Sequence, residues 1–153
     1  MEIKLGKYEF ILSKEVLFIL NFHKQLRGFD TEKGGIILGT VSENKISLDR
    51  LSVPTELDKA NRMNFERHRL SAQIIVDYEF FNSDGQVTYL GEWHTHPEKN
   101  PTPSETDRKM IRQQFSKNII HTPFLLLLIQ GLEKLYIGIV DEDGLSTTTQ
   151  EIL

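Results

Sequence analysis

An uninterrupted apolar run from Phe124 to Ile129 constrains the fold more than any other segment of the chain. The run is too short to cross a bilayer, and it is typical of a strand that is buried on both faces of a sheet. Leu135, Ile137 and Ile139 then alternate with other residues, as expected of a neighbouring strand joined by a hairpin. We therefore expect a sheet with the 124–129 strand in its interior.

The rest of the chain mixes predicted helices and strands without a regular strand-helix-strand rhythm. In chain order, we predict a helix over 13–27 that Ser13 caps and Gly28 ends, strands over 34–41 and 45–53, an irregular loop over 54–69, a helix over 71–81, a strand over 86–94 and a helix over 104–115. Periodicity assigns Val16, Ile19, Leu20 and Phe22 to the apolar positions of the first helix, and Ile74, Tyr78 and Phe81 to the inner face of the second. The pattern predicts an α/β fold with one domain over residues 1–153.

Composition excludes several classes of function. The chain has no cysteine, so His, Asp and Glu are the available strong metal ligands. A net charge of −4 provides no basic stripe for phosphates, so we expect no nucleic-acid partner. We expect no membrane partner either, because no apolar run is long enough. The N-terminus lacks the pattern of a secretion signal, which predicts a cytoplasmic location.

The segment from Gly91 to Asp107 holds the candidate site. His94 and His96 are two residues apart at the end of a predicted strand, so their imidazoles project to the same face and can meet at one metal ion. On the next helix Asp107 shares a stripe with Ile111 and Phe115, which are expected to face the core. Coordination of a cation offsets the desolvation of such a carboxylate. Two imidazoles and one carboxylate leave a fourth zinc position open to water, as in hydrolytic sites.

Simpler interpretations exist for most of these residues. A His-x-His pair alone is common and usually has no metal, and the spacing of Ser104 and Asp107 also fits a helix capping box. Glu92 shares the face of the histidines, so it is an alternative metal ligand or a residue that supports one. Trp93 points the other way and is expected to pack in the core. Charged residues of the 54–69 loop, namely Arg62, Arg67 and His68, are best explained as exposed solubilising charge.

Two motifs resemble those of the JAMM (MPN+/JAB) zinc metallopeptidases. From His94 to Asp107 the chain matches His-x-His, seven residues, Ser, two residues, Asp, and Glu32 to Gly39 looks like the family's Glu-x-Gly-Gly-x-x-x-Gly entry into a strand. The resemblance implies a curved mixed sheet flanked by helices, similar to cytidine deaminases, whose zinc thiolates this chain lacks. It also implies a Zn²⁺ ion held by His94, His96 and Asp107. In the same pattern Glu32 is the general base that deprotonates the water, and Ser104 donates a hydrogen bond to the oxyanion.

The segment from Tyr89 to Pro97 looks like the stand-alone bacterial branch associated with CBASS anti-phage operons. Members of that branch cleave the bond after the C-terminus of a conjugated cGAS-like nucleotidyltransferase, so the implied substrate is a protein conjugate with an extended C-terminal tail. Two alternatives remain within the fold: a JAMM peptidase that processes another ubiquitin-like or sulfur-carrier protein, and a non-catalytic MPN-type scaffold. A structural metal module would need a fourth protein ligand, for which Glu92 is the nearest candidate.

Overall fold

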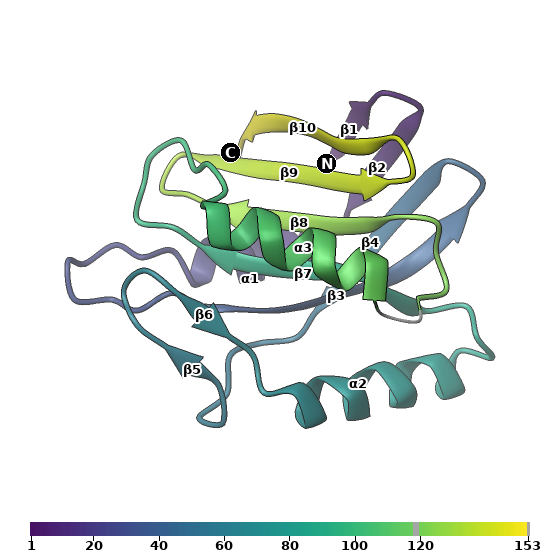
Figure 1. Ribbon diagram of the computed structural model, residues 1–153, viewed down its shortest axis with the longest axis horizontal. Helices are drawn as coiled ribbons and strands as arrows, with labels where there is room; N and C mark the ends of the chain where they lie inside the picture. The colour runs from purple at the N-terminus through teal and green to yellow at the C-terminus, as the bar shows by residue number, and fades with distance from the viewer. Residues whose placement is uncertain (118–119, 153) are drawn as a thin grey trace.

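A computed structural model describes residues 1–117 and 120–152. Eight strands form one sheet in the order β1-β2-β4-β3-β7-β8-β9-β10. Their bounds are β1 Glu2–Leu5, β2 Tyr8–Leu12, β3 Gly34–Ser42, β4 Lys45–Leu51, β7 Thr88–Thr95, β8 Leu125–Gln130, β9 Lys134–Asp141 and β10 Gly144–Glu151. The sheet is mixed, because β2 pairs with β4 and β7 with β8 in parallel while the other pairs are antiparallel. It is also curved, and the edge strands β1 and β10 come into contact (Figure 1).

The predicted interior strand is confirmed as β8, in which every residue is buried. Leu126 and Leu128 belong to a core cluster with residues of α1 (Lys14–Phe22), on one face of the sheet. Leu125, Leu127 and Ile129 pack on the other face, in a cluster with Ile111 of α3 (Glu105–Lys117). Helix α2 (Arg69–Asn82) lies on the same face as α3 and contacts β3 and β7 (Figure 1). The predicted α/β fold with a curved mixed sheet flanked by helices is therefore confirmed.

The prediction for the first helix was wrong at its C-terminal end. Ser13 caps α1 as expected, with its hydroxyl accepting a hydrogen bond from the Val16 amide, but the helix ends at Phe22 rather than near Arg27. Beyond it Gln25 turns inward, is 3% exposed and donates to the carbonyl oxygens of Asp30 and Arg62. Phe22, predicted to be an apolar contact of the helix, is 70% exposed.

The inner face of α2 was also predicted wrongly. Ile74, Tyr78 and Phe81 are 60%, 64% and 81% exposed, so they point away from the sheet. The face that packs on β3 is instead made by Ala72, Ile75 and Val76. Both stripes have helical spacing, and the small side chain of Ala72 lets that face approach the sheet closely.

Several strands were not predicted. The N-terminal pair β1 and β2 and the last strand β10 extend the sheet at its two edges. The 54–69 segment, predicted to be irregular, contains a small hairpin of β5 (Lys59–Ala60) and β6 (Phe65–Glu66). These two strands are too short for an alternating pattern to be recognised. No helix within residues 1–117 and 120–152 is long and apolar enough to cross a membrane.

Candidate metal centre

Three predicted side chains converge where β7 ends. The Nε2 atoms of His94 and His96 lie 3.1 Å apart, since alternation along the strand places both rings on the face that α3 covers. Asp107, in the first turn of α3, reaches both rings: its Oδ1 is 3.3 Å from His94 Nε2 and its Oδ2 is 3.3 Å from His96 Nε2. The structure therefore brings two imidazoles from β7 and a carboxylate from α3 together around one point.

The spacing of these atoms fits a tetrahedral zinc site. Zinc binds imidazole nitrogen at about 2.0–2.1 Å, so ligand atoms at the corners of a tetrahedron are about 3.3–3.4 Å apart. The observed separations of 3.1 and 3.3 Å are close to this edge length. Both histidines are buried, and the Asp107 side chain is 14% exposed. These three ligands suit a divalent metal, because its charge would offset the repulsion between the ligand atoms and the cost of their desolvation.

Glu32 is the second carboxylate beside the histidines. Its Oε1 lies 3.6 Å from His96 Nε2, and Glu32, His94 and His96 offer three potential ligand atoms within 4.8 Å of one another. A metal could thus draw its carboxylate from Glu32 or from Asp107. The distances favour Asp107, because its two oxygens contact both rings more closely whereas Glu32 approaches one of them.

The position of Glu32 is set by its neighbours in the 31–33 loop. The Thr95 amide donates to the Lys33 carbonyl at 2.9 Å, and the Lys33 amide donates to the Thr95 hydroxyl at 3.0 Å. The Glu32 amide donates to the carbonyl of Asn61 at 2.8 Å. Gly34 must lack a side chain, because a Cβ there would lie 2.6 Å from Cδ1 of Phe65. These contacts hold the loop against the end of β7, and they explain the first glycine of the Glu-x-Gly-Gly pattern.

The two carboxylates have opposite pKa shifts. Burial raises the pKa of Glu32 to about 7, against an opposing effect of His96. Burial also acts to raise the pKa of Asp107, but hydrogen bonds from His94 and His96 outweigh it and hold that pKa well below its ordinary value. Of the two, Glu32 is therefore the group suited to exchange a proton near neutral pH, and Asp107 the group suited to remain ionised.

Ser104 lies at the N-terminus of α3 in the predicted capping box. Its Oγ accepts a hydrogen bond from the Asp107 amide at 3.1 Å, and its own amide donates to Asp107 Oδ2 at 2.7 Å. Ser104 is exposed, and because its Oγ accepts in the cap, its hydroxyl proton is left to donate to another group. The cap also fixes the carboxylate that faces the histidines, so capping and metal binding are compatible uses of Asp107.

Comparison with known proteins identifies the family. A family model described as prokaryotic homologs of the JAB domain matches residues 17–136, which include Glu32, His94, His96, Ser104 and Asp107. The chain belongs to the prokaryotic JAB-domain family. A relative from Pseudomonas aeruginosa named CD-NTase/cGAS isopeptidase is 36% identical to it over 132 residues, which is 86% of this chain and 83% of the relative.

Other similar proteins agree with this assignment. A protein of the same name from Escherichia coli is 34% identical over 128 residues, covering 84% of this chain and 80% of the relative. A probable metalloprotease, y4qB, from Sinorhizobium fredii is 31% identical over 88 residues, 56% of this chain and 54% of that protein. The solution structure of protein DSY2949 from Desulfitobacterium hafniense has a TM-score of 0.59 at 18% identity, covering 94% of this chain and 91% of that one, so it is similar in fold.

Glu92 of this JAB domain has partners other than the metal site. Arg67 Nε donates to both of its carboxylate oxygens, at 2.8 and 2.9 Å, and the Tyr89 hydroxyl donates to Oε1 at 2.6 Å. Burial raises the pKa of Glu92, and Arg67 and the Tyr89 hydrogen bond oppose that shift. Since both oxygens are engaged, this geometry disfavours Glu92 as a metal ligand.

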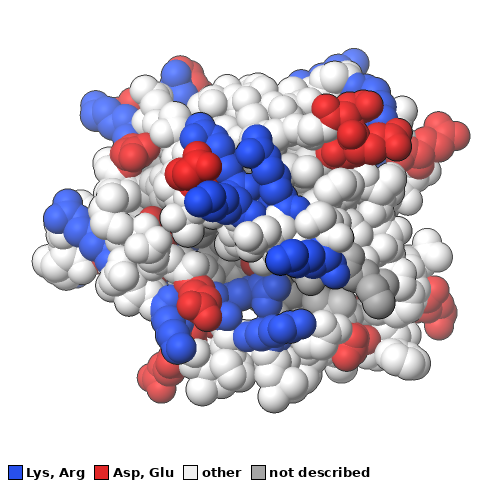
Figure 2. All heavy atoms as spheres, in the orientation of Figure 1, with Lys and Arg blue, Asp and Glu red and all other residues white. Residues whose placement is uncertain are grey.

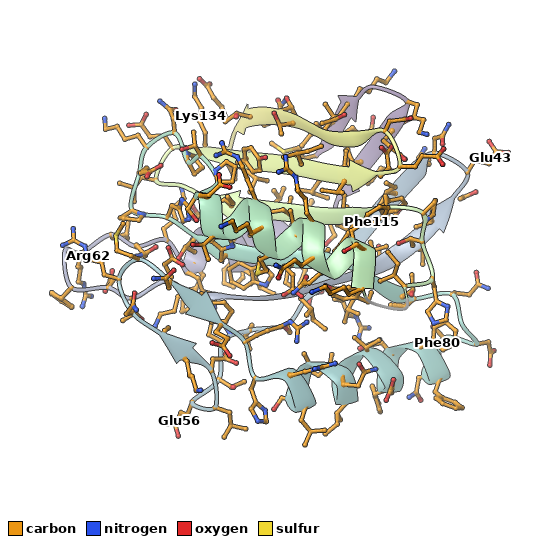
Figure 3. All side chains as sticks on the ribbon, viewed as in Figure 1. Glu43, Glu56, Arg62, Phe80, Phe115 and Lys134 are labelled. Atoms are coloured by element: carbon orange, nitrogen blue, oxygen red, sulfur yellow. The ribbon has the colours of Figure 1, made fainter. Side chains whose placement is uncertain are left out.

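Among the charged residues of the 54–69 loop, the prediction of solubilising charge was wrong for two. The Arg67 side chain is 22% exposed because it is bound to Glu92. His68 caps α2, its side chain accepting a hydrogen bond from the Ser71 amide. Arg62 is exposed as predicted and lies at the outer end of its loop (Figure 3). No periodic signal marked Arg67, because it directly follows a short hairpin that was not predicted. Trp93 packs in the core, as expected.

Proposed function

We propose that this chain is a zinc-dependent isopeptidase that releases a conjugated cGAS-like nucleotidyltransferase from its target. The proposal is supported by relatives that are named CD-NTase/cGAS isopeptidase. The observation that carries the proposal is the convergence of His94, His96 and Asp107 with ligand-atom separations of 3.1–3.3 Å. We assign these residues to the metal, Glu32 to proton transfer and Ser104 to the oxyanion. Residues 1–153 would act as one peptidase domain in the cytoplasm.

The chemistry is hydrolysis of the amide between the tail's C-terminal carboxyl and a lysine amine. Bound zinc supplies Lewis acidity and lowers the pKa of water beside it. Glu32 takes a proton from the attacking water as the water oxygen bonds to the carbonyl carbon. The Ser104 hydroxyl donates to the carbonyl oxygen as negative charge develops there. Glu32 then returns the proton to the amine nitrogen as the C–N bond breaks.

Two features favour this proposal over the alternatives. A non-catalytic scaffold has no need of a buried carboxylate that lies beside His96 and has its pKa raised to about 7, as Glu32 has. A structural metal module needs a fourth protein ligand, but Glu92 is occupied by Arg67 and Tyr89, and Glu32 lies farther from His96 than Asp107 does, at 3.6 against 3.3 Å. Processing of another ubiquitin-like or sulfur-carrier tail would use the same residues, so the substrate must be distinguished by experiment.

The proposal is tested with isopeptides of defined sequence. Each joins the last ten residues of a CD-NTase, or of a ubiquitin-like or sulfur-carrier protein, through its carboxyl to the side-chain amine of an acetylated lysine peptide. Zinc-loaded protein should cut the CD-NTase isopeptide at the isopeptide bond, with products identified by mass spectrometry. Glu32→Gln should reduce kcat by about 10²–10⁴, and Glu56→Gln, at an exposed position away from the site (Figure 3), should have no effect. No cleavage of any tail by zinc-loaded protein would refute the proposal.

A further inference from the structure

Two hollows adjoin on the face of the molecule that carries α2 and α3. The first, of about 330 Å³, is lined by His94, Asp107 and Met110 among others and so opens onto the candidate metal centre. The second, of about 550 Å³, lies between α2 and the end of α3. Arg67 and Arg69 line both, so the two hollows form one groove that leads away from the metal centre.

The second hollow combines an apolar floor with a basic rim. Ile36, Ala72, Val76 and Tyr89 supply the floor. On the rim are Arg69 of α2 and Lys117 of α3, both exposed, and neither is in an ion pair within the part of the chain that the structure describes.

The remaining charges of the second hollow do not cancel this basic rim. The charge of Arg67 is met by Glu92. Asp77, an acidic residue of the lining, accepts a hydrogen bond from the neutral Gln73 and keeps its charge, but the two charges of Arg69 and Lys117 outweigh it. Figure 2 shows Lys and Arg side chains gathered over α3 and on both sides of the hollow beneath it. The chain as a whole has a net charge of −4, so this basic face is a local feature.

The strand beneath the groove gives a scale for its length. His94, Glu92 and Tyr89 lie along β7, and Tyr89 is five residues from His94. Glu92 lines the first hollow and Tyr89 the second, so at a rise of about 3.3 Å per residue the floor of the second hollow is roughly 10–17 Å from the metal centre. An extended peptide has the same rise, so its residues about three to five positions from the scissile bond would lie over this hollow.

We propose that the second hollow is a specificity subsite for an acidic side chain of the substrate tail, about three to five residues before the isopeptide bond. This inference rests on the proposed function and adds the chemical class of tail. Arg69 and Lys117 attract the carboxylate, while Val76 and Tyr89 pack against its methylene groups. Arg67, which lines both hollows, is held in place by Glu92.

Peptide binding tests the subsite without requiring turnover. Fluorescein-labelled ten-residue tails, with Glu, Gln or Lys at the third to fifth positions from the C-terminus, are titrated with zinc-loaded protein and followed by anisotropy. We expect the Glu peptide to bind roughly threefold to tenfold more tightly than the Gln peptide, because exposed charge pairs are individually weak. The preference should disappear in about 0.5 M NaCl, where charges are screened beyond a few ångströms.

Charge reversal provides the matched control. Arg69→Glu with Lys117→Glu should invert the order, so that the Lys peptide binds best, which a misfolded protein cannot do. Lys109 is also exposed on α3 but lies outside the hollow, so Lys109→Glu should leave the order of peptide affinities unchanged. If circular dichroism shows that the double variant is not folded, the single variant Lys117→Glu should reduce the preference for the Glu over the Gln peptide at least twofold.

Three results would overturn the subsite. These are equal binding of Glu and Gln peptides, a preference that survives charge reversal, and tighter binding of a ten-nucleotide single-stranded DNA than of the Glu peptide. Cleavage is scored separately with isopeptides that carry Glu in the tail or in the lysine peptide. A preference for Glu in the lysine peptide also refutes the inference. Selective binding with no cleavage of any isopeptide would instead refute the proposed function and leave the acidic-ligand site standing.

Discussion

Replacing Glu92 by glutamine separates its structural role from a role in metal binding. The Glu92 side chain is only 6% exposed, and its carboxylate accepts hydrogen bonds from Arg67 and Tyr89 at 2.6–2.9 Å. Glutamine keeps the volume, so no cavity forms, but it leaves the Arg67 charge without a counter-ion. Loss of one partner of a buried ion pair costs about 3–5 kcal/mol. Because the Arg67 side chain is 22% exposed and keeps some solvation, we place the expected loss near the lower end, at about 3 kcal/mol.

Urea denaturation of the metal-free protein, followed by circular dichroism at 25 °C, measures this loss. With a slope of about 2 kcal/mol per molar urea, typical of small proteins, the midpoint should fall by roughly 1.5 M. Glu79→Gln is the matched control. Glu79 also pairs with an arginine, Arg50, at 2.6 Å, but the Arg50 side chain is 59% exposed. Loss of an exposed pair should cost less than about 1 kcal/mol.

The same variant tests the alternative metal ligand. Glu92→Gln should bind about one zinc per chain, as expected of a mononuclear site. Replacing both Arg67 and Glu92 by methionine should be less destabilising than Glu92→Gln, because no unpaired charge remains buried. Our reasoning is refuted if Glu92→Gln destabilises no more than Glu79→Gln, and a loss of zinc in Glu92→Gln would restore Glu92 as a ligand.

Further predictions concern the core, the surface and pH. Leu128→Ala should lower the free energy of unfolding by about 2–5 kcal/mol, because the side chain is fully buried in β8; a loss under 1 kcal/mol would contradict its packing. Ile74→Ser should change the free energy of unfolding by no more than about 0.5 kcal/mol, since Ile74 is 60% exposed. A large loss would indicate that this face of α2 packs on the core. In metal-free protein the folded state binds the Glu32 proton more tightly than the unfolded chain, so this contribution to stability is complete below pH 4.5 and is lost as pH rises to about 7. Glu32→Gln should therefore flatten the fall in unfolding free energy over that interval, and an unchanged slope in urea titrations would count against the raised pKa.

The extent to which the sequence predicted the fold follows from the strength of each periodic signal. The continuous apolar run of β8 and the alternation in β9 identified the sheet interior, because burial on both faces requires such residues. Helix α2 was located correctly but turned the wrong way, since Ile74, Tyr78 and Phe81 are spaced as regularly as Ala72, Ile75 and Val76. Size and hydrophobicity favoured the first stripe, whereas close packing on β3 requires the second.

The site was predictable where it is local in sequence. His94 and His96 lie on one strand, so alternation alone places their rings together. The approach of Glu32 to His96 depends on hydrogen bonds between Lys33 and Thr95, which are 62 residues apart and leave no periodic signal. Arg67 was missed for the same reason, since its partner Glu92 is 25 residues away. Resemblance to the JAMM motif located Glu32, but it gave no indication of Arg67.

Metal analysis of matched variants tests the central claim most directly. The zinc content of wild-type protein, Glu32→Gln, His94→Ala and Asp107→Ala is measured by plasma mass spectrometry after identical loading with zinc and desalting. We predict about one zinc per chain in the wild type and in Glu32→Gln, and much less than one in His94→Ala and Asp107→Ala. Full zinc occupancy in both His94→Ala and Asp107→Ala, each folded by circular dichroism, would show that the metal binds elsewhere and would contradict the site described above.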